Sequence, residues 1–205
     1  QSHNIKIGNT FSCIKTIHRK ISIYSNCSQL MQIRETNMKD SEGIKNLHLQ
    51  AFDNSEAELV SDFAVNLLHE KSTINIISLV AIDNDAIIGH TAFSPVFLVS
   101  TNEHFGYILA PLAVLPTHQN NRVGSTIVKH GLDIIFSLGT FIVFVYGDPQ
   151  YYSRFGFKKN LAQNFSPPYT LQYPEGLQAI KLNSTVLPEG GRFKCVNSLN
   201  DPKLW

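Results

Sequence analysis

The stretch from Tyr107 to Leu132 constrains the fold most, because a strand pattern changes into a helix pattern across one polar turn. Residues 107–115 are apolar and interrupted only by Pro111, which predicts a buried strand with a break or bulge. Beyond Pro116, apolar residues recur with helical spacing, at Val123, Ile127, Val128 and Leu132. The turn between strand and helix would leave backbone N–H groups unpaired at the positive end of the helix dipole. This arrangement predicts an anion site, most usefully for a phosphate.

The turn resembles the acyl-CoA signature of the GNAT N-acyltransferase superfamily, a hydrophobic strand followed by Gln/Arg-x-x-Gly-x-Gly/Ala. Gln119 and Gly124 match this signature, and Arg122 stands where the family usually has its first glycine. A second segment, Tyr146 to Phe157, contains Tyr152, Gly156 and Phe157 at the spacing of the family's Tyr-x-x-x-Gly-Phe segment. The two motifs together identify the chain as resembling this superfamily.

The resemblance runs from about Met31 to near Pro188. The string Gly-Asp-Pro-x-Tyr-Tyr-x-Arg-Phe-Gly-Phe, with Gly89-His90 and Phe93-Ser-Pro-Val96 upstream, is similar to a bacterial subgroup of these acetyltransferases. The resemblance implies an α/β fold with a mixed, largely antiparallel sheet. In the family, a central pair of strands is splayed and about four helices flank the sheet.

The chain of 205 residues predicts one domain with a possible appendage. Residues 1–30 contain no Asp or Glu and are expected to be a leader or appendage outside the core. Upstream or expression-derived sequence and a targeting segment are both open for them, and residues 21–24 could form an edge strand. Residues 31–188 are the expected acyltransferase domain, and residues 189–205 the C-terminal tail.

The bulk composition excludes some functional classes. The net charge of +1 gives no basic face for nucleic acid or a membrane surface, and no apolar run is as long as a membrane span. Three cysteines without metal-ligand spacing indicate free thiols in a reducing, cytoplasmic setting and no bound metal. The oligomeric state cannot be predicted.

Local patterns predict the remaining elements. Strands are expected over residues 31–36, 74–82, 86–99, 141–146 and 177–182. Two helices are expected between the first two strands, the second opened by a capping box of Ser55 and Glu58. Residues 83–85 are a hairpin turn, and Asp148 caps a short helix that ends at Gly156.

The resemblance implies acetyl-CoA as the cosubstrate and a small-molecule or peptide amine as the acceptor. Backbone N–H groups of residues 120–125 would hold the pyrophosphate, and the backbone of residues 112–114 would polarise the thioester. The full cofactor-binding set is Leu112, Ala113, Val114, Gln119, Asn120, Asn121, Arg122, Val123, Gly124 and Ser125. The acceptor pocket is expected between the two early helices and the loop of residues 100–104.

Tyr152 occupies the position at which the family places the tyrosine that protonates the departing thiolate, and Tyr151 is the fallback. The alternative for either tyrosine is a structural role, as an aromatic side chain packed in the core. The general base is open among water and four side chains, Glu56, Glu58, His90 and His118. A non-catalytic acyl-CoA-binding sensor is the alternative function, because Arg122 replaces a glycine and no clear base exists.

Overall fold

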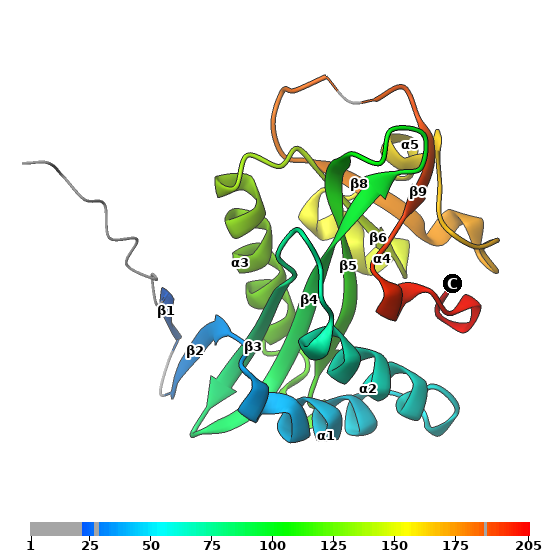
Figure 1. Cartoon of the computed structure of the whole chain (residues 1–205). Coiled ribbons are helices and arrows are strands. Elements are labelled where there is room, and N and C mark those ends of the chain that lie inside the picture. Colours follow the sequence, from blue (N-terminus) through cyan, green and yellow to red (C-terminus); the bar gives the residue numbers. More distant parts are fainter. Residues whose placement is uncertain (1–21, 27–28, 187) are drawn as a thin grey trace, which may run out of the picture.

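A computed structural model describes residues 22–26, 29–186 and 188–205 (Figure 1). The expected leader therefore lies largely outside the described residues. Its described part includes β1 (Ser22–Asn26), which pairs antiparallel with β2 (Gln29–Glu35) at the edge of the sheet. The edge strand expected near residues 21–24 is thus present, and the division of the chain at residue 30 stays a prediction.

One sheet runs through the molecule in the order β1-β2-β3-β4-β5-β6-β8. All neighbouring strands on this path are antiparallel except β5 and β6, so the expected mixed, largely antiparallel α/β sheet is confirmed. The four strands after β2 are β3 (Ile77–Asp83), β4 (Ala86–Leu98), β5 (His104–Val114) and β6 (Ile142–Tyr146). Three short strands follow, β7 (Phe165–Ser166), β8 (Leu177–Lys181) and β9 (Gly191–Lys194).

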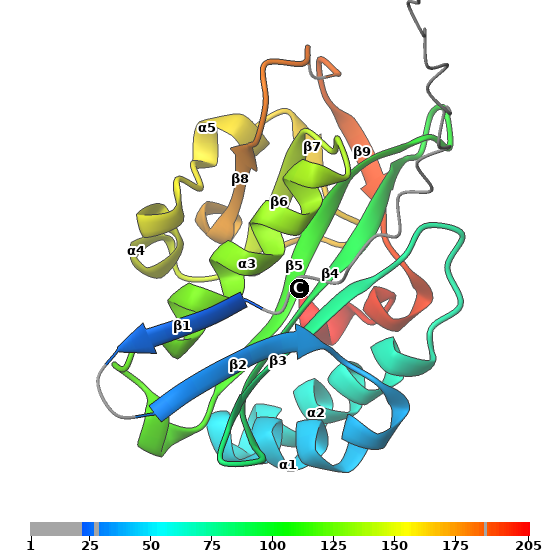
Figure 2. The same cartoon turned by 90° about the vertical axis from the view of Figure 1, so that its left-hand side faces the viewer.

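Helices cover both faces of the sheet (Figures 1 and 2). The expected early helices are α1 (Ser41–Ala51) and α2 (Asn54–His69), which pack on one face. The helix after the turn is α3 (Val123–Ser137), on the other face. Two short helices, α4 (Pro149–Tyr152) and α5 (Lys159–Ala162), complete the α-helical elements of the described chain.

The capping box predicted at the second helix is wrong. Ser55 lies inside α2, and the helix begins after Asp53, whose carbonyl accepts hydrogen bonds from the N–H groups of Glu56 and Ala57. A capping box forms instead at Asn37, where Asp40 accepts a hydrogen bond from the Asn37 N–H. The extended backbone of Asp53, with φ of −66° and ψ of 151°, starts α2 two residues before Ser55, so Ser55 cannot act as the N-cap residue.

The hairpin and bulge predictions are confirmed. Asn84 and Asp85 both adopt positive φ, 46° and 62°, as a type I′ turn between β3 and β4 requires. At Pro111 the register slips, because Thr91 pairs with Leu112 while Phe93 pairs with Leu109. A β carbon at Gly89 would lie 2.9 Å from Val123 Cγ1, so this glycine lets the start of α3 press against β4.

The C-terminal residues expected to form a tail pack into the core. Strand β9 pairs with β4 and β7, and Phe193 on it is fully buried. Farther on, Leu199 is 2% exposed and Trp205 7% exposed, in the same cluster as the buried face of α2. Residues 189–205 therefore build one side of the molecule (Figure 1), beside α2.

Candidate active site

The two parallel strands at the centre of the sheet separate after a short stretch of pairing. β5 and β6 pair at only three positions, the last being Leu109 with Val145. β5 then continues to Val114, while β6 ends at Tyr146 and the chain turns into α4. The splayed central pair expected for the fold is therefore present.

A cavity of about 830 Å³ fills the opening between these strands. One wall is the β5 segment from Leu109 to Leu112, and the opposite wall runs from Tyr146 to Pro149. Side chains of α2, residues 172–176 and the C-terminal residues 199–205 close the remaining sides. The loop of residues 100–104, expected to line the acceptor pocket, does not line this cavity.

The end of β5 presents free backbone groups to the opening. Leu115 N–H donates to Ile88 O on β4, whereas Val114 O accepts a 3.2 Å hydrogen bond from the Gln119 side chain. Backbone groups of successive strand residues point to opposite sides. The N–H groups of Leu112 and Val114 therefore point away from β4, toward the side that β6 has left, and that of Ala113 points toward β4.

The polar turn after β5 takes two left-handed residues. Asn120 and Arg122 both have φ of 63°, and Arg122 is the N-cap residue of α3. The left-handed backbone at Arg122 explains why the related signature has glycine there, since only glycine adopts this conformation without steric cost. Arg122 itself is exposed to solvent.

The first turn of α3 leaves three donors without helical partners. Thr126 N–H donates to Arg122 O in the first hydrogen bond of the helix, at 2.9 Å. The N–H groups of Val123, Gly124 and Ser125 precede that bond, so they have no acceptor within the helix. Gly124 is the closely packed member, because a β carbon there would lie 2.6 Å from the Tyr151 hydroxyl and 3.4 Å from Val114 Cγ2. The arrangement suits an anion that lies against the backbone.

Both tyrosines of α4 line the cavity, but they lie in different surroundings. The Tyr151 hydroxyl reaches toward Gly124, and the Arg154 guanidinium lies 4.5 Å from the Tyr151 ring centroid. Tyr152 packs edge-on against Tyr151 and Phe157, and its ring lies against Gly147. Burial raises the pKa of the Tyr152 hydroxyl above its usual value, assisted by Tyr151 and Asp148. Tyr152 therefore remains protonated across the physiological pH range.

Asp148 and Arg154 lie on the same short segment but do not contact each other through a hydrogen bond or ion pair in the described structure. Asp148 instead accepts a 2.9 Å hydrogen bond from the Gln150 N–H, as the predicted N-cap of α4. Arg154 lies over the Tyr151 ring. Gly156 adopts φ of 93° and ends this segment, as predicted.

The structure separates the two candidate glutamates. Glu56 lines the cavity, whereas Glu58 two residues later does not. Positions two apart on a helix point in different directions, so only one of the two could face the site. Glu56 is the general-base candidate that the fold brings to the cavity.

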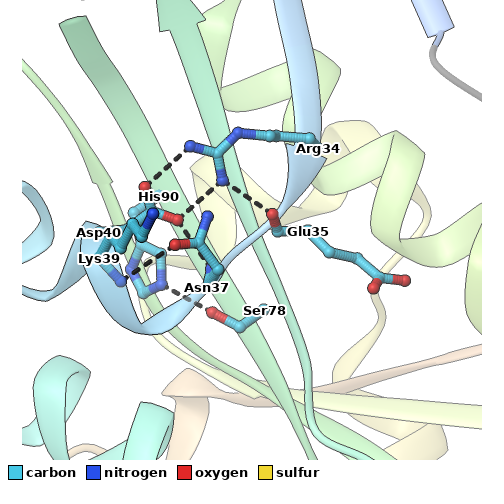
Figure 3. A network of polar contacts seen from close by, with 7 residues as sticks. All are labelled: Arg34, Glu35, Asn37, Lys39, Asp40, Ser78 and His90. Carbon is cyan, nitrogen blue, oxygen red and sulfur yellow. Dashed lines mark hydrogen bonds and ion pairs between the residues drawn. The ribbon is translucent and has the colours of Figure 1, made fainter.

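His90 belongs to a buried polar network (Figure 3). Its ring nitrogens lie 3.0 Å from Ser78 Oγ and 2.9 Å from His48 Nε2. Burial lowers the pKa of His48 to about 3 and lowers that of His90 well below its ordinary value. Both rings are therefore neutral near pH 7, and neither lines the cavity.

The same network fixes the start of α1 through an ion pair. Arg34 holds both carboxylate oxygens of Asp40, at 2.7 and 2.8 Å, and this pairing lowers the pKa of Asp40 (Figure 3). These contacts favour a structural role for His90 over a catalytic one, because its network holds α1 against β4. His118, the other histidine candidate, lies in the turn after β5, with its Nδ1 2.9 Å from Thr117 Oγ1, and does not line the cavity.

The described residues contain no group of three His, Cys, Asp or Glu side chains placed to hold a metal ion. Within the same residues, no helix has both the length and the apolar character needed to span a bilayer. Cys195 is a free thiol, and burial raises its pKa above the usual value. The other two cysteines lie outside the described residues.

A family model described as "Acetyltransferase (GNAT) domain" matches residues 32–159. The chain belongs to the GNAT acetyltransferase family. The matched segment runs from β2 through α4 and contains both sequence motifs. The resemblance to the superfamily is therefore confirmed, and with it the assignment of this chain as an acetyltransferase.

Two relatives from Escherichia coli strain K12 are named as N-acetyltransferases of uncharacterised role. YjhQ is 34% identical over 125 residues, which cover 60% of this chain and 67% of YjhQ. YhbS is 36% identical over 122 residues, which cover 58% of this chain and 68% of YhbS.

Solved GNAT structures share the fold of this chain. YhbS of Escherichia coli in complex with CoA aligns over 87% of this chain and 96% of its own, with a TM-score of 0.70 and 26% identity. A GNAT acetyltransferase of Brucella melitensis in complex with acetyl-CoA aligns over 80% and 94%, with a TM-score of 0.59 and 25% identity.

Proposed function

We propose that this GNAT protein is an N-acetyltransferase that moves an acetyl group from acetyl-CoA to an amine by direct attack on the thioester. The observation that carries the proposal is the continuity of the site. Tyr151 lines the opening between β5 and β6, and its hydroxyl reaches Gly124 in the turn where the first N–H groups of α3 lack helical acceptors. One extended cosubstrate can therefore place its pyrophosphate on the turn and its thioester in the opening. The complexes of structural neighbours with CoA and with acetyl-CoA support this proposal.

The residues assigned to the cosubstrate follow from this placement. The turn residues Asn120, Asn121 and Arg122 surround the pyrophosphate, and the three N–H groups at the start of α3 bind it. Gln119 holds the turn against β5 through its hydrogen bond to Val114 O. The N–H groups of Leu112 and Val114 donate to the thioester carbonyl and the pantetheine arm, where developing negative charge strengthens the hydrogen bonds. Ala113 supplies strand pairing with His90 on β4.

Tyr152 is the proposed general acid. It lines the cavity, and its pKa is raised, so a proton is available for the departing thiolate at neutral pH. We also propose that the chain belongs to the bacterial subgroup with the Gly-Asp-Pro-x-Tyr-Tyr-x-Arg-Phe-Gly-Phe string. In this chain, that string supplies the N-cap of α4, both cavity tyrosines and the left-handed Gly156.

Two measurements test the proposal together. Calorimetry with acetyl-CoA measures binding, and a thiol reagent measures CoA release when amines are added. We expect saturable binding and amine-dependent release of the thiol. Binding without thiol release for any amine would favour the alternative function, a sensor that keeps the acyl-CoA site without turnover.

A further inference from the structure

The acceptor side of the cavity carries an excess of negative charge. Three carboxylates line it, those of Glu56, Asp148 and Glu175, against one ammonium group, that of Lys203. All four residues are exposed, so the charges lie toward the mouth of the cavity. A protonated amine is attracted to this mouth, whereas an acceptor that also carries a carboxylate meets repulsion from the same groups.

The cavity wall opposite β5 is aromatic and held in one orientation. The Trp205 and Tyr146 rings stack with centroids 6.3 Å apart and planes 20° apart. The polar edge of each ring is already occupied. Trp205 Nε1–H donates to Leu199 O at 3.1 Å, and the Tyr146 hydroxyl accepts from the Tyr173 N–H at 3.0 Å. The rings therefore offer mainly apolar surface to a ligand, because the indole N–H already donates a hydrogen bond and the Tyr146 oxygen already accepts one.

Most residues of this wall come later in the sequence than the segment that the family model covers. The GNAT model ends at residue 159, whereas Tyr173, Leu199, Lys203 and Trp205 all follow it. The family segment supplies the cosubstrate turn and Tyr152, and the later residues close the acceptor side. The C-terminal part of this chain therefore contributes to acceptor selection, together with Glu56, Tyr146 and Asp148 of the family segment.

We propose that the acceptor is a primary amine with an aromatic body and no carboxylate. The amine enters as the ammonium ion, its ring lies along the Tyr146 and Trp205 wall, and Glu56 accepts a proton from the nitrogen. The proposal rests on the function proposed above. Aromatic rings bind such a body by burial and stacking, and they also attract a cationic head group.

The proton balance of the transfer is complete with these residues. The ammonium group loses one proton to Glu56, and the freed nitrogen lone pair forms the C–N bond as the C–S bond breaks. Tyr152 gives its proton to the thiolate, and the second proton lost from nitrogen restores the Tyr152 hydroxyl. Glu56 returns its proton to solvent, so one proton is released for each amide and CoA thiol formed.

Matched acceptor pairs provide the test. Tryptamine and tryptophan differ by one carboxylate, as do 2-phenylethylamine and phenylalanine. We expect kcat/KM, measured by CoA thiol release, to be at least tenfold higher for the amine of each pair. An equal or higher value for the amino acids would overturn the inference.

Two glutamates of α2 provide a matched pair of variants. Glu56→Gln should lower kcat/KM for tryptamine at least tenfold and shift the acid limb of its pH profile, with the Kd for acetyl-CoA unchanged. Glu58→Gln removes the same charge two residues away, outside the cavity, and should leave tryptamine turnover unchanged. Equal effects of the two variants would contradict a specific role for Glu56.

A third variant tests the charge of the cavity mouth. Lys203→Glu adds negative charge at an exposed position and should widen the preference for tryptamine over tryptophan.

Two variants of Trp205 test the aromatic wall. Trp205→Phe keeps an aromatic ring in the wall, whereas Trp205→Ala removes it and should raise KM for tryptamine more than for butylamine. An equal rise for both amines would contradict the aromatic wall.

The outcomes distinguish this inference from the proposed function. Saturable acetyl-CoA binding with preferred acetylation of tryptophan overturns the acceptor class and leaves the acetyltransferase standing. Absence of acetyl-CoA binding overturns both. If no acceptor is turned over, calorimetry on the CoA-saturated protein decides the acceptor class, because tryptamine should bind more tightly than tryptophan, and equal or weaker binding of tryptamine overturns the inference.

Discussion

Replacement of Gly124 by valine tests the proposed phosphate turn. A β carbon at residue 124 would lie 2.6 Å from the Tyr151 hydroxyl, closer than such contacts normally allow. The hydroxyl is the far end of a side chain that can rotate, and valine has a better helix propensity than glycine by a few tenths of a kcal/mol. The fold should therefore tolerate the change, with a stability cost of about 1 kcal/mol.

The cost to binding should be larger and more specific. The valine side chain occupies the space over the Gly124 N–H, so an approaching phosphate loses that charge-assisted hydrogen bond, worth about 1.5–3 kcal/mol. The Kd for acetyl-CoA, measured by calorimetry, should rise at least tenfold, equivalent to about 1.4 kcal/mol. A folded Gly124→Val protein with unchanged affinity would refute the placement of the pyrophosphate.

Gly139→Ala provides the control for a glycine substitution. Gly139 lies just beyond α3, with φ of 78° and no atom within 4 Å of a β carbon built on it. Alanine there should cost about 1 kcal/mol of stability through the left-handed backbone and leave acetyl-CoA affinity unchanged. Equal loss of affinity in both variants would indicate a general effect of destabilisation.

Two further predictions concern the turn and the buried histidines. Arg122→Gly should leave the melting temperature unchanged or higher, because it removes a left-handed arginine with φ of 63°. The same variant should weaken acetyl-CoA binding several-fold at low salt, because it removes a positive charge. A lower melting temperature in thermal denaturation would contradict the first expectation. Burial lowers the pKa of His48 to about 3, so below about pH 6.5 the unfolded chain binds a proton that the folded chain does not, and stability decreases as the pH falls toward 3. From His48 alone, urea unfolding should show a loss of about 2 kcal/mol between pH 7 and pH 5, and a flat profile would refute the buried neutral pair.

The cosubstrate side of the molecule was predictable because its signals are local. Pro111 marked the bulge, Gly124 the close approach at the turn, and Asp148 and Gly156 the two ends of the segment that carries Tyr152. Each of these residues determines the conformation of its own backbone or of its nearest neighbours, so the effect can be predicted from the local sequence.

The C-terminal part of the acceptor side was not predictable because its residues meet only through tertiary packing. Phe193, Leu199 and Trp205 are separated by Asn, Asp and Pro, and their spacing has neither helical nor strand periodicity. Their burial depends on the aromatic partners Tyr146 and Phe144, about fifty residues earlier. The left-handed conformation of Arg122 was equally hidden, since a non-glycine residue gives no sign of positive φ.

Comparison of Tyr152→Phe with the wild-type protein tests the central claim most directly. Phenylalanine keeps the ring that packs against Tyr151 and Phe157, and it removes only the hydroxyl. With an amine that the wild-type protein acetylates, CoA thiol release should be roughly 10²-fold slower, while the acetyl-CoA Kd barely changes. Full turnover by Tyr152→Phe would contradict the role of this tyrosine as the general acid and transfer that role to Tyr151 or a bound water.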